Sequence, residues 1–137
     1  MRHFYIFNIS DDYKYNNNID PYILYKIFEE LYNINNNDIK YVINIFNSIT
    51  NPINKKYFNN KLYNEYKNND TYIKFMNKHQ INNYYNKEKS SLIVKNSYIK
   101  LDTSSLNPSF LKYLHKYKNL FVCDFENKDY FWIESIA

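Results

Sequence analysis

The chain of 137 residues contains no glycine. At ordinary usage of roughly 7%, about nine or ten glycines would be expected. A phosphate-binding P-loop, a dinucleotide-binding Gly fingerprint, a kinase Gly-rich loop, an EF-hand loop and a Gly-flanked nucleophile elbow all need backbone geometry that only glycine supplies. The sequence therefore excludes most common nucleotide-dependent chemistry.

Size and composition favour one folded domain over residues 1–137. Apolar residues make up 45% of the chain and aromatic residues 20%, which is typical of a folded protein. The net charge is +4, from 18 basic and 14 acidic residues without long like-charge runs. The single cysteine, Cys123, excludes an internal disulfide and a cysteine-based zinc site. No signal peptide or long apolar run is visible, so we expect a cytoplasmic protein without a membrane span.

The first half of the chain predicts one strand followed by three helices. Residues 3–9 are dense in β-branched and aromatic residues on both faces, which favours an interior strand. Asp20 before Pro21 is typical of a helix start, because Asp caps the first turn and Pro fits the first helical position. Two further helices are predicted over about 38–49 and 54–68. In the second helix the apolar stripe is Ile39, Val42, Ile43, Phe46 and Ile49, with Ile45 on its flank.

The second half predicts two hairpins around one helix. Residues 91–95 and 98–101 indicate two short strands around Asn96-Ser97, and 120–125 and 130–133 indicate two more around a tight turn. Asn107-Pro108 starts the helix between them. A short helical piece is expected over 72–76, and 77–90 is ambiguous. The fold class is therefore α/β or α+β, a sheet of about five strands packed by helices in the order strand, three helices, two strands, helix, two strands.

Asparagine is expected to replace glycine at the turns. Asn tolerates the left-handed backbone conformation best after Gly. The chain has 25 asparagines, and several stand where turns are predicted, at 33–37, 96 and 127. We therefore expect these positions to take the conformations that glycine adopts in other sequences.

No residue constellation indicates catalysis or metal binding. The three histidines, His3, His79 and His115, lack partners at metal-ligand spacing, and a structural role is expected for His3. Cys123 lies within an apolar strand, which favours a buried, unreactive thiol. Adjacent carboxylates such as Asp11 and Asp12 point in different directions and do not form an acid–base pair by spacing alone. We therefore expect no enzyme activity and no cofactor.

Two kinds of binding surface are compatible with the residues. The stretch 55–78 is rich in Lys, Tyr and Asn and could form a nucleic-acid-binding face, although a solvated helix face explains it better in a chain so rich in these residues. Tyr13 and Tyr15 lie in a polar segment, and Tyr22 and Tyr25 flank the first helix stripe. Interfaces favour tyrosine, so these residues indicate a protein-binding surface, unless composition alone accounts for them.

Three segments carry a resemblance to a known family. They are Arg2-His3-Phe4-Tyr5 with the later Asp11-Asp12-Tyr13, then Ile49-Thr50-Asn51-Pro52-Ile53, and Asp124-Phe125-x-x-Lys128-x-Tyr130-x-Trp132 near the end. In this order and approximate spacing they resemble the SirA family of sporulation inhibitors of replication, found in low-GC spore-forming bacteria. The resemblance covers nearly the whole chain and is loosest over 54–90. It implies a single SirA-like domain with a central sheet packed by helices.

The resemblance also implies a function. SirA-like proteins bind domain I of the replication initiator DnaA and restrain new rounds of replication when sporulation begins. The implied partner-binding residues are Tyr13, Asn17, Ile45 and Ser48; the family has aromatic residues at 13 and 17, a polar residue at 45 and a tyrosine at 48. Tyr15 could replace the missing aromatic at Asn17. The protein is thus expected to be a non-enzymatic regulator, monomeric on its own, with no direct nucleic-acid binding; the alternative is a small nucleic-acid-binding domain.

Overall fold

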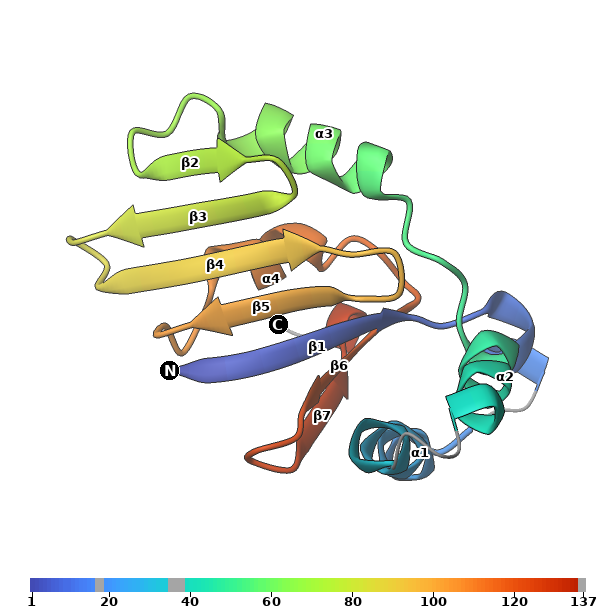
Figure 1. Ribbon diagram of the computed structural model, residues 1–137. Helices are drawn as coiled ribbons and strands as arrows, with labels where there is room; N and C mark the ends of the chain where they lie inside the picture. The colour runs from blue at the N-terminus through green and yellow to red at the C-terminus, as the bar shows by residue number, and fades with distance from the viewer. Residues whose placement is uncertain (17–18, 35–38, 136–137) are drawn as a thin grey trace.

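The computed structural model describes residues 1–16, 19–34 and 39–135. Their elements, in chain order, are β1 (Arg2–Asn8), η1 (Asp12–Asn16), α1 (Pro21–Asn33), α2 (Ile39–Ile49), α3 (Lys55–Tyr66), β2 (Tyr72–Phe75), β3 (Lys78–Asn83), β4 (Glu88–Val94), β5 (Ile99–Thr103), α4 (Ser109–Leu114), β6 (Leu120–Asp124), β7 (Asp129–Trp132) and η3 (Ile133–Ser135). Within the described residues the strands form one antiparallel sheet in the order β2-β3-β4-β5-β1-β6-β7 (Figure 1).

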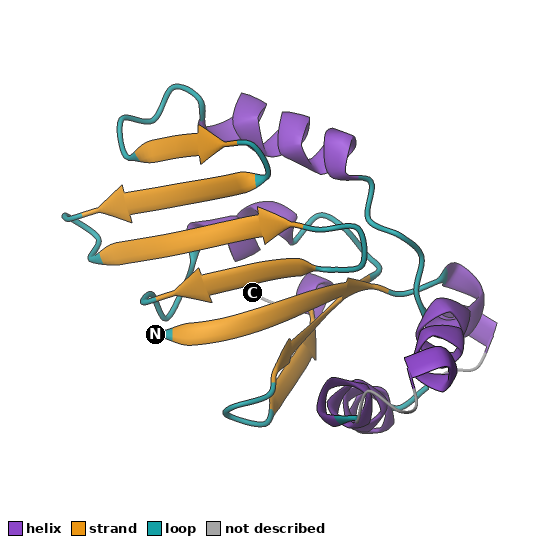
Figure 2. Cartoon of the chain, in the orientation of Figure 1, coloured by secondary structure: helices purple, strands orange, loops and turns teal. Residues whose placement is uncertain are grey.

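Strand β1 lies between β5 and β6 and divides the core in two. Phe4 and Ile6 point to the face that α3 and α4 cover, whereas Phe7 and Ile9 beyond them point to the face that α1 and α2 cover. Figure 2 shows the two pairs of helices on opposite sides of the sheet. The expectation of an interior first strand, apolar on both faces, is confirmed.

The sheet has seven strands where about five were predicted. Strand β2 occupies the segment expected to be a short helix, and β3 lies in the ambiguous polar segment. Both strands bury only one face, and the inward residues are few: Tyr72 in β2, and His79 with Ile81 in β3. The solvent-facing positions of β3 are polar, so β3 lacks the apolar density that identified the other strands, and β2 is only four residues long.

Residues next to α1 and α3 cap the first turns of these two helices, whereas a residue distant in the chain caps the first turn of α4. The Asp20 carboxylate accepts a hydrogen bond from the Tyr22 amide at 2.8 Å, as the Asp-Pro signal predicts. Helix α4 has no side-chain cap of its own. Instead, Glu88 of β4 accepts hydrogen bonds from the Ser109 amide at 3.0 Å and the Ser109 hydroxyl at 2.6 Å. A buried strand carboxylate thereby satisfies the first turn of a helix that begins 21 residues later in the chain.

The left-handed positions are not held by asparagine. Among the described residues, positive φ angles occur at Met76 (53°), Lys87 (53°) and Lys128 (52°). The prediction was therefore wrong for Asn33, Asn96 and Asn127, while 35–37 lie outside the described residues. In the last turn Asn127 uses its amide groups instead, donating from its side chain to Asp124 at 2.8 Å, and the next residue takes the left-handed conformation.

This backbone strain predicts that introducing glycine stabilises the protein. Lys87 is exposed in the β3–β4 turn, and a side chain in the left-handed region costs roughly 1 kcal/mol that glycine avoids. Lys87→Gly should therefore raise the melting temperature by about 3 °C in a thermal scan. Lys87→Ala removes the same charge but keeps Cβ, so it should give no increase; an equal rise in both variants would contradict the explanation.

Candidate protein-binding surface

The residues just before η1 are joined to the end of α2 by backbone contacts. Ile9 and Thr50 form a β-bridge, and the Ser10 amide donates to the Ile49 carbonyl at 2.8 Å. The Asn51 amide in turn donates to the Asn8 carbonyl at 2.9 Å. Two segments that are about 40 residues apart in the chain therefore lie side by side at one end of β1 (Figure 1). The predicted site residues come from these two segments.

The two tyrosines of η1 are placed differently. Tyr13 is half-buried against the core beneath α1 and α2, and its burial raises the pKa of its hydroxyl above the ordinary value. Tyr15 is 60% exposed. Asn17, the third candidate in this part of the chain, lies outside the described residues. Tyr15 is thus the aromatic side chain of this pair that is available to a partner over most of its surface.

On α2, Ile45 and Ser48 share one side of the helix. Ile45 is half-buried against the same core as Tyr13, which matches its predicted position on the flank of the apolar stripe. Ser48 is exposed, and its hydroxyl donates to the Ile45 carbonyl at 2.6 Å. One turn before Ile45, Tyr41 is 63% exposed. Residues spaced at i, i+4 and i+7 lie on one helix face, so Tyr41, Ile45 and Ser48 form a strip, here named the α2 outer strip.

The opposite side of α2 faces a hollow. Helices α1 and α2 and the sheet enclose about 400 Å³ lined mainly by apolar and aromatic residues, including Tyr5, Phe28, Phe46 and Tyr98. Ile43 lines the rim of this hollow and is half exposed, so its expected place in the buried stripe was wrong. Helix α2 therefore presents two exposed flanks, and Ile43 provides an apolar position away from the outer strip.

Lys14 fixes the orientation of η1, and nothing in the sequence pattern identified it. Its side chain is only 12% exposed. The ammonium contacts the Glu134 carboxylate and the Lys118 carbonyl, and it lies 4.4 Å from the centre of the Trp132 ring. These contacts come from the end of the chain, so the turn that carries Tyr15 is anchored to the last strand and the segment after it. Only the three-dimensional contacts reveal this role.

Of the two tyrosines that flank the stripe of α1, one is exposed as expected and the other is not. Tyr22 is exposed, but Tyr25 is buried in the core, where its hydroxyl donates to Glu29 at 2.8 Å. Tyr25 therefore packs the interior and does not form part of a surface. Its burial, followed by this hydrogen bond, raises the pKa of the Tyr25 hydroxyl.

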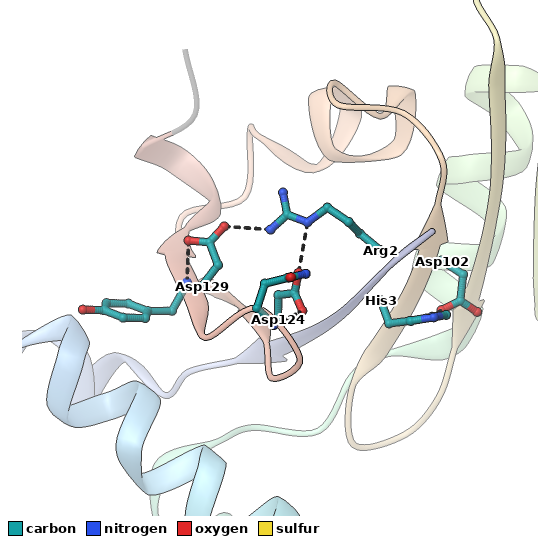
Figure 3. Close-up of polar contacts among 7 residues, drawn as sticks. Arg2, His3, Asp102, Asp124 and Asp129 are labelled. Carbon is teal, nitrogen blue, oxygen red and sulfur yellow. Dashed lines mark hydrogen bonds and ion pairs between the residues drawn. The ribbon is translucent and has the colours of Figure 1, made fainter.

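The first and last segments meet in an ion-pair cluster. Arg2 donates from Nε to Asp124 at 3.0 Å and from Nη2 to Asp129 at 2.8 Å (Figure 3). Burial alone would raise the pKa of Asp124, but hydrogen bonds from Asn127 and Arg2 outweigh it and hold the pKa below its ordinary value. His3, which follows Arg2 on β1, contacts Asp102 on the neighbouring strand β5, and this contact gives His3 the structural role expected for it. These contacts tie the start of the chain to the final hairpin.

Two of the residues considered for chemistry, Cys123 and His79, have structural roles in the core. The Cys123 thiol is fully buried among apolar residues, and its burial raises the pKa of the thiol, as expected for an unreactive cysteine. His79 is fully buried with both ring nitrogens hydrogen-bonded, and His115 is exposed at the end of α4. Within the part of the chain that the structure describes, no group of three His, Cys, Asp or Glu side chains could hold a metal ion.

The stretch 55–78 does not form one continuous face. Three of its aromatic rings, those of Phe58, Tyr66 and Tyr72, are buried in the core, so they cannot stack on bases. Tyr57 and Tyr63 remain exposed on α3. The basic and aromatic residues that looked interleaved in the sequence are therefore divided between the interior and the surface.

Together, these features describe a small α+β protein whose candidate site is a surface built from a turn and a helix. A family model described as "Sporulation inhibitor of replication protein SirA" matches residues 2–137, and the chain belongs to this family. None of the curated proteins compared with the chain matches it. The helices in the described ranges are all too short or too polar to cross a membrane.

Proposed function

We propose that this protein restrains the initiation of DNA replication at the onset of sporulation by binding domain I of DnaA through η1 and the α2 outer strip. It acts in the cytoplasm as a non-enzymatic regulator. Family membership supports the biological role. The observation that supports the choice of surface is the set of backbone contacts between residues 8–10, just before η1, and residues 49–51 at the end of α2.

The surface has the composition of a protein interface. Tyr15 and Tyr41 are more than half exposed, and tyrosine supplies a large contact area with few rotatable bonds. On the α2 outer strip, Ile45 adds a half-buried apolar position between Tyr41 and Ser48. Binding would bury roughly 1,000–1,600 Å² in total, a small or standard interface. Inhibition then needs no chemistry, because a protein that occupies a surface of the initiator blocks whatever else uses it.

Truncating an exposed anchor should weaken binding without unfolding the protein. We expect Tyr15→Ala to raise the Kd for the cognate DnaA domain I about tenfold in isothermal titration calorimetry, because the ring contacts the partner and little else. Ser48→Arg should weaken binding similarly by placing a long charged side chain on the α2 outer strip. Tyr13→Ala is less informative, since this ring is half-buried and its removal also affects the core.

The matched control for Tyr15 is Tyr85, which is 98% exposed in the β3–β4 turn at the far end of the sheet. Tyr85→Ala should leave the Kd unchanged. Absence of wild-type binding at tens of micromolar would reject DnaA domain I as the partner. If both Tyr15→Ala and Tyr85→Ala weaken binding to the same degree, or if neither variant weakens it, binding uses another surface.

A further inference from the structure

One half of one sheet face has no helix over it. Helices α3 and α4 cover the face that contains the inward residues of β2 to β5. On the opposite face, α1 and α2 pack against β1, β6 and β7 and do not extend over the other strands. Figures 1 and 2 show β2, β3, β4 and β5 side by side with this second face uncovered by the described helices. We call it the open face.

The strand register places lysines and rings in a row across the open face. Phe75 pairs with Lys78, Lys78 with Ile93, Ile93 with Lys100, and Lys100 with Tyr5. Residues paired in this way on adjacent strands lie about 5 Å apart on the same face. At one end of the row the Phe75 side chain is 73% exposed, and at the other the Lys100 ammonium lies 5.6 Å from the Tyr5 ring centre. The row therefore alternates cations with flat or apolar groups.

The open face is strongly positive. It carries four lysines: Lys78, Lys89, Lys95 and Lys100. Among the described residues none of these ammonium groups has a carboxylate within 4 Å. The acid on these strands that faces them is Asp102, which already pairs with His3, and Glu126 lies at the margin beside Lys100. An anionic partner would thus meet four cations without displacing an existing ion pair.

The open face is also hollowed. A depression of about 350 Å³ lies over β2, β3, β4 and β5, and its polar lining includes Lys78, Gln80, Asn82, Lys89, Ser91 and, at the β5 side, Asp102, which pairs with His3. The amide and hydroxyl groups can donate or accept hydrogen bonds, and the two lysines supply charge. This combination suits a polar, anionic chain that lies across the strands.

We propose that the open face binds single-stranded nucleic acid. Proteins bind single strands by combining a positively charged surface that follows the phosphates with aromatic rings on which bases stack. An antiparallel sheet with exposed rings and cations is one arrangement that does this. The lysines would contact phosphates, and Phe75 would stack on a base. A rigid duplex cannot present unstacked bases to a sheet, and an acidic peptide offers nothing for an exposed ring to stack on.

This site is separate from the surface proposed for DnaA, because it lies on the strands distant from η1. It shares Phe75 and Lys78 with the stretch 55–78 of the sequence-based alternative, but it joins them to Lys89 of β4 and Lys100 of β5 on one face of the sheet. Its test needs no DnaA, so a failure here leaves the protein–protein proposal intact.

Fluorescence polarisation of a labelled 12-nucleotide oligothymidylate with the full chain tests the proposal. We expect micromolar binding at 50 mM salt. About three phosphate contacts would weaken binding about twentyfold between 50 and 200 mM salt. A labelled duplex of the same length should bind more weakly than the single strand, and polyglutamate should compete poorly. No binding at 50 mM salt, equal binding of the duplex, or equal competition by polyglutamate would overturn the proposal.

Two variants locate the site. Lys78→Glu combined with Lys89→Glu should weaken binding at least tenfold, and Phe75→Leu, which keeps an apolar side chain but removes the ring, should weaken it about threefold. The matched control is Lys56→Glu with Lys61→Glu, an equal charge change at exposed positions of α3. Equal loss in both double variants would overturn the proposal by showing that charge alone drives binding. Thermal melts monitored by circular dichroism verify that each variant is folded.

Discussion

Lowering the pH from 7 to 4 is expected to reduce the free energy of unfolding by about 3 kcal/mol through the imidazole of His79 alone. His79 is fully buried in a chain of hydrogen bonds. Tyr72 donates to its Nδ1 at 2.7 Å, and its Nε2 donates to the Asn59 side-chain oxygen at 2.7 Å. Asn59 then donates to Asn77 at 2.8 Å. The neutral imidazole satisfies both neighbours, whereas the cation would present a second N–H to the Tyr72 hydroxyl.

The direction follows from the two protonation equilibria. Burial, with a smaller contribution from Lys74, lowers the pKa of His79 in the folded protein to about 4, against 6.5 as its ordinary value. Above pH 6.5 His79 is neutral in both the folded and the unfolded protein, so its titration does not reduce the free energy of unfolding there. Between pH 6.5 and about 4 the unfolded chain binds a proton that the folded protein does not. Stability is therefore lost as the pH falls through this window.

Urea denaturation at pH 7, 5.5 and 4 measures the effect. The variant His79→Gln cannot titrate, so its unfolding free energy should change much less over the same range. The lowered pKa values of Glu29 and Asp124 also reduce stability in acid, but mainly below the ordinary pKa of those carboxyl groups. An NMR titration that places the pKa of His79 near 6.5 in the wild-type protein would contradict the prediction without requiring the variant to fold.

The elements that the sequence predicts well have local signals. The start of α1 depends on Asp20 and Pro21, which act within one turn. The last hairpin was predicted because two apolar runs flank a short polar segment, and β6 pairs with β7 as expected. The interior position of β1 followed from apolar residues on both of its faces. In each case the residues that decide the structure are neighbours in the chain.

Features that depend on distant contacts were not predictable. Strand β3 looks polar because only His79 and Ile81 face inward, and β2 has only four residues; the sheet itself must exist before their packing counts. Lysine does not favour the left-handed conformation, so nothing in the local sequence predicts it at Lys87 and Lys128. The tertiary structure imposes that conformation. Local preference is a weak guide where tertiary packing opposes it.

The candidate surface shows the same division. Ile45 was placed correctly on the flank of its helix stripe because helical spacing is local. Tyr41 was missed because one exposed tyrosine in a chain with 17 carries no signal by itself. Lys14 was missed because its contacts lie more than 100 residues away, at Trp132 and Glu134. The assignment of this surface to DnaA stays a prediction.

Replacing Arg2 with alanine is expected to lower the free energy of unfolding by about 2 to 3 kcal/mol. The Asp124 side chain is fully buried, and removing one member of a buried pair leaves an uncompensated charge. Arg2 also holds Asp129, and its guanidinium lies 4.6 Å from the centre of the Phe4 ring. Because part of Arg2 reaches solvent, the loss should fall below that of a fully buried pair.

A series of substitutions at Arg2 separates the effect of its two hydrogen bonds from the effect of its positive charge. Arg2→Lys keeps one positive charge but cannot donate to Asp124 and Asp129 in the same geometry, so its stability in urea should lie between those of Arg2→Ala and wild type. Lys26→Ala, which removes an exposed pair with Glu29 on α1, should leave the midpoint nearly unchanged. Arg2→Ala should also raise the pKa of Asp124, since one of the hydrogen bonds that lower it is lost.

If Arg2→Ala and Lys26→Ala unfold at the same urea concentration, the contact between the first strand and the last hairpin does not stabilise the fold. The joint presence of Arg2 and the Asp124 segment in the family resemblance would then need a functional explanation.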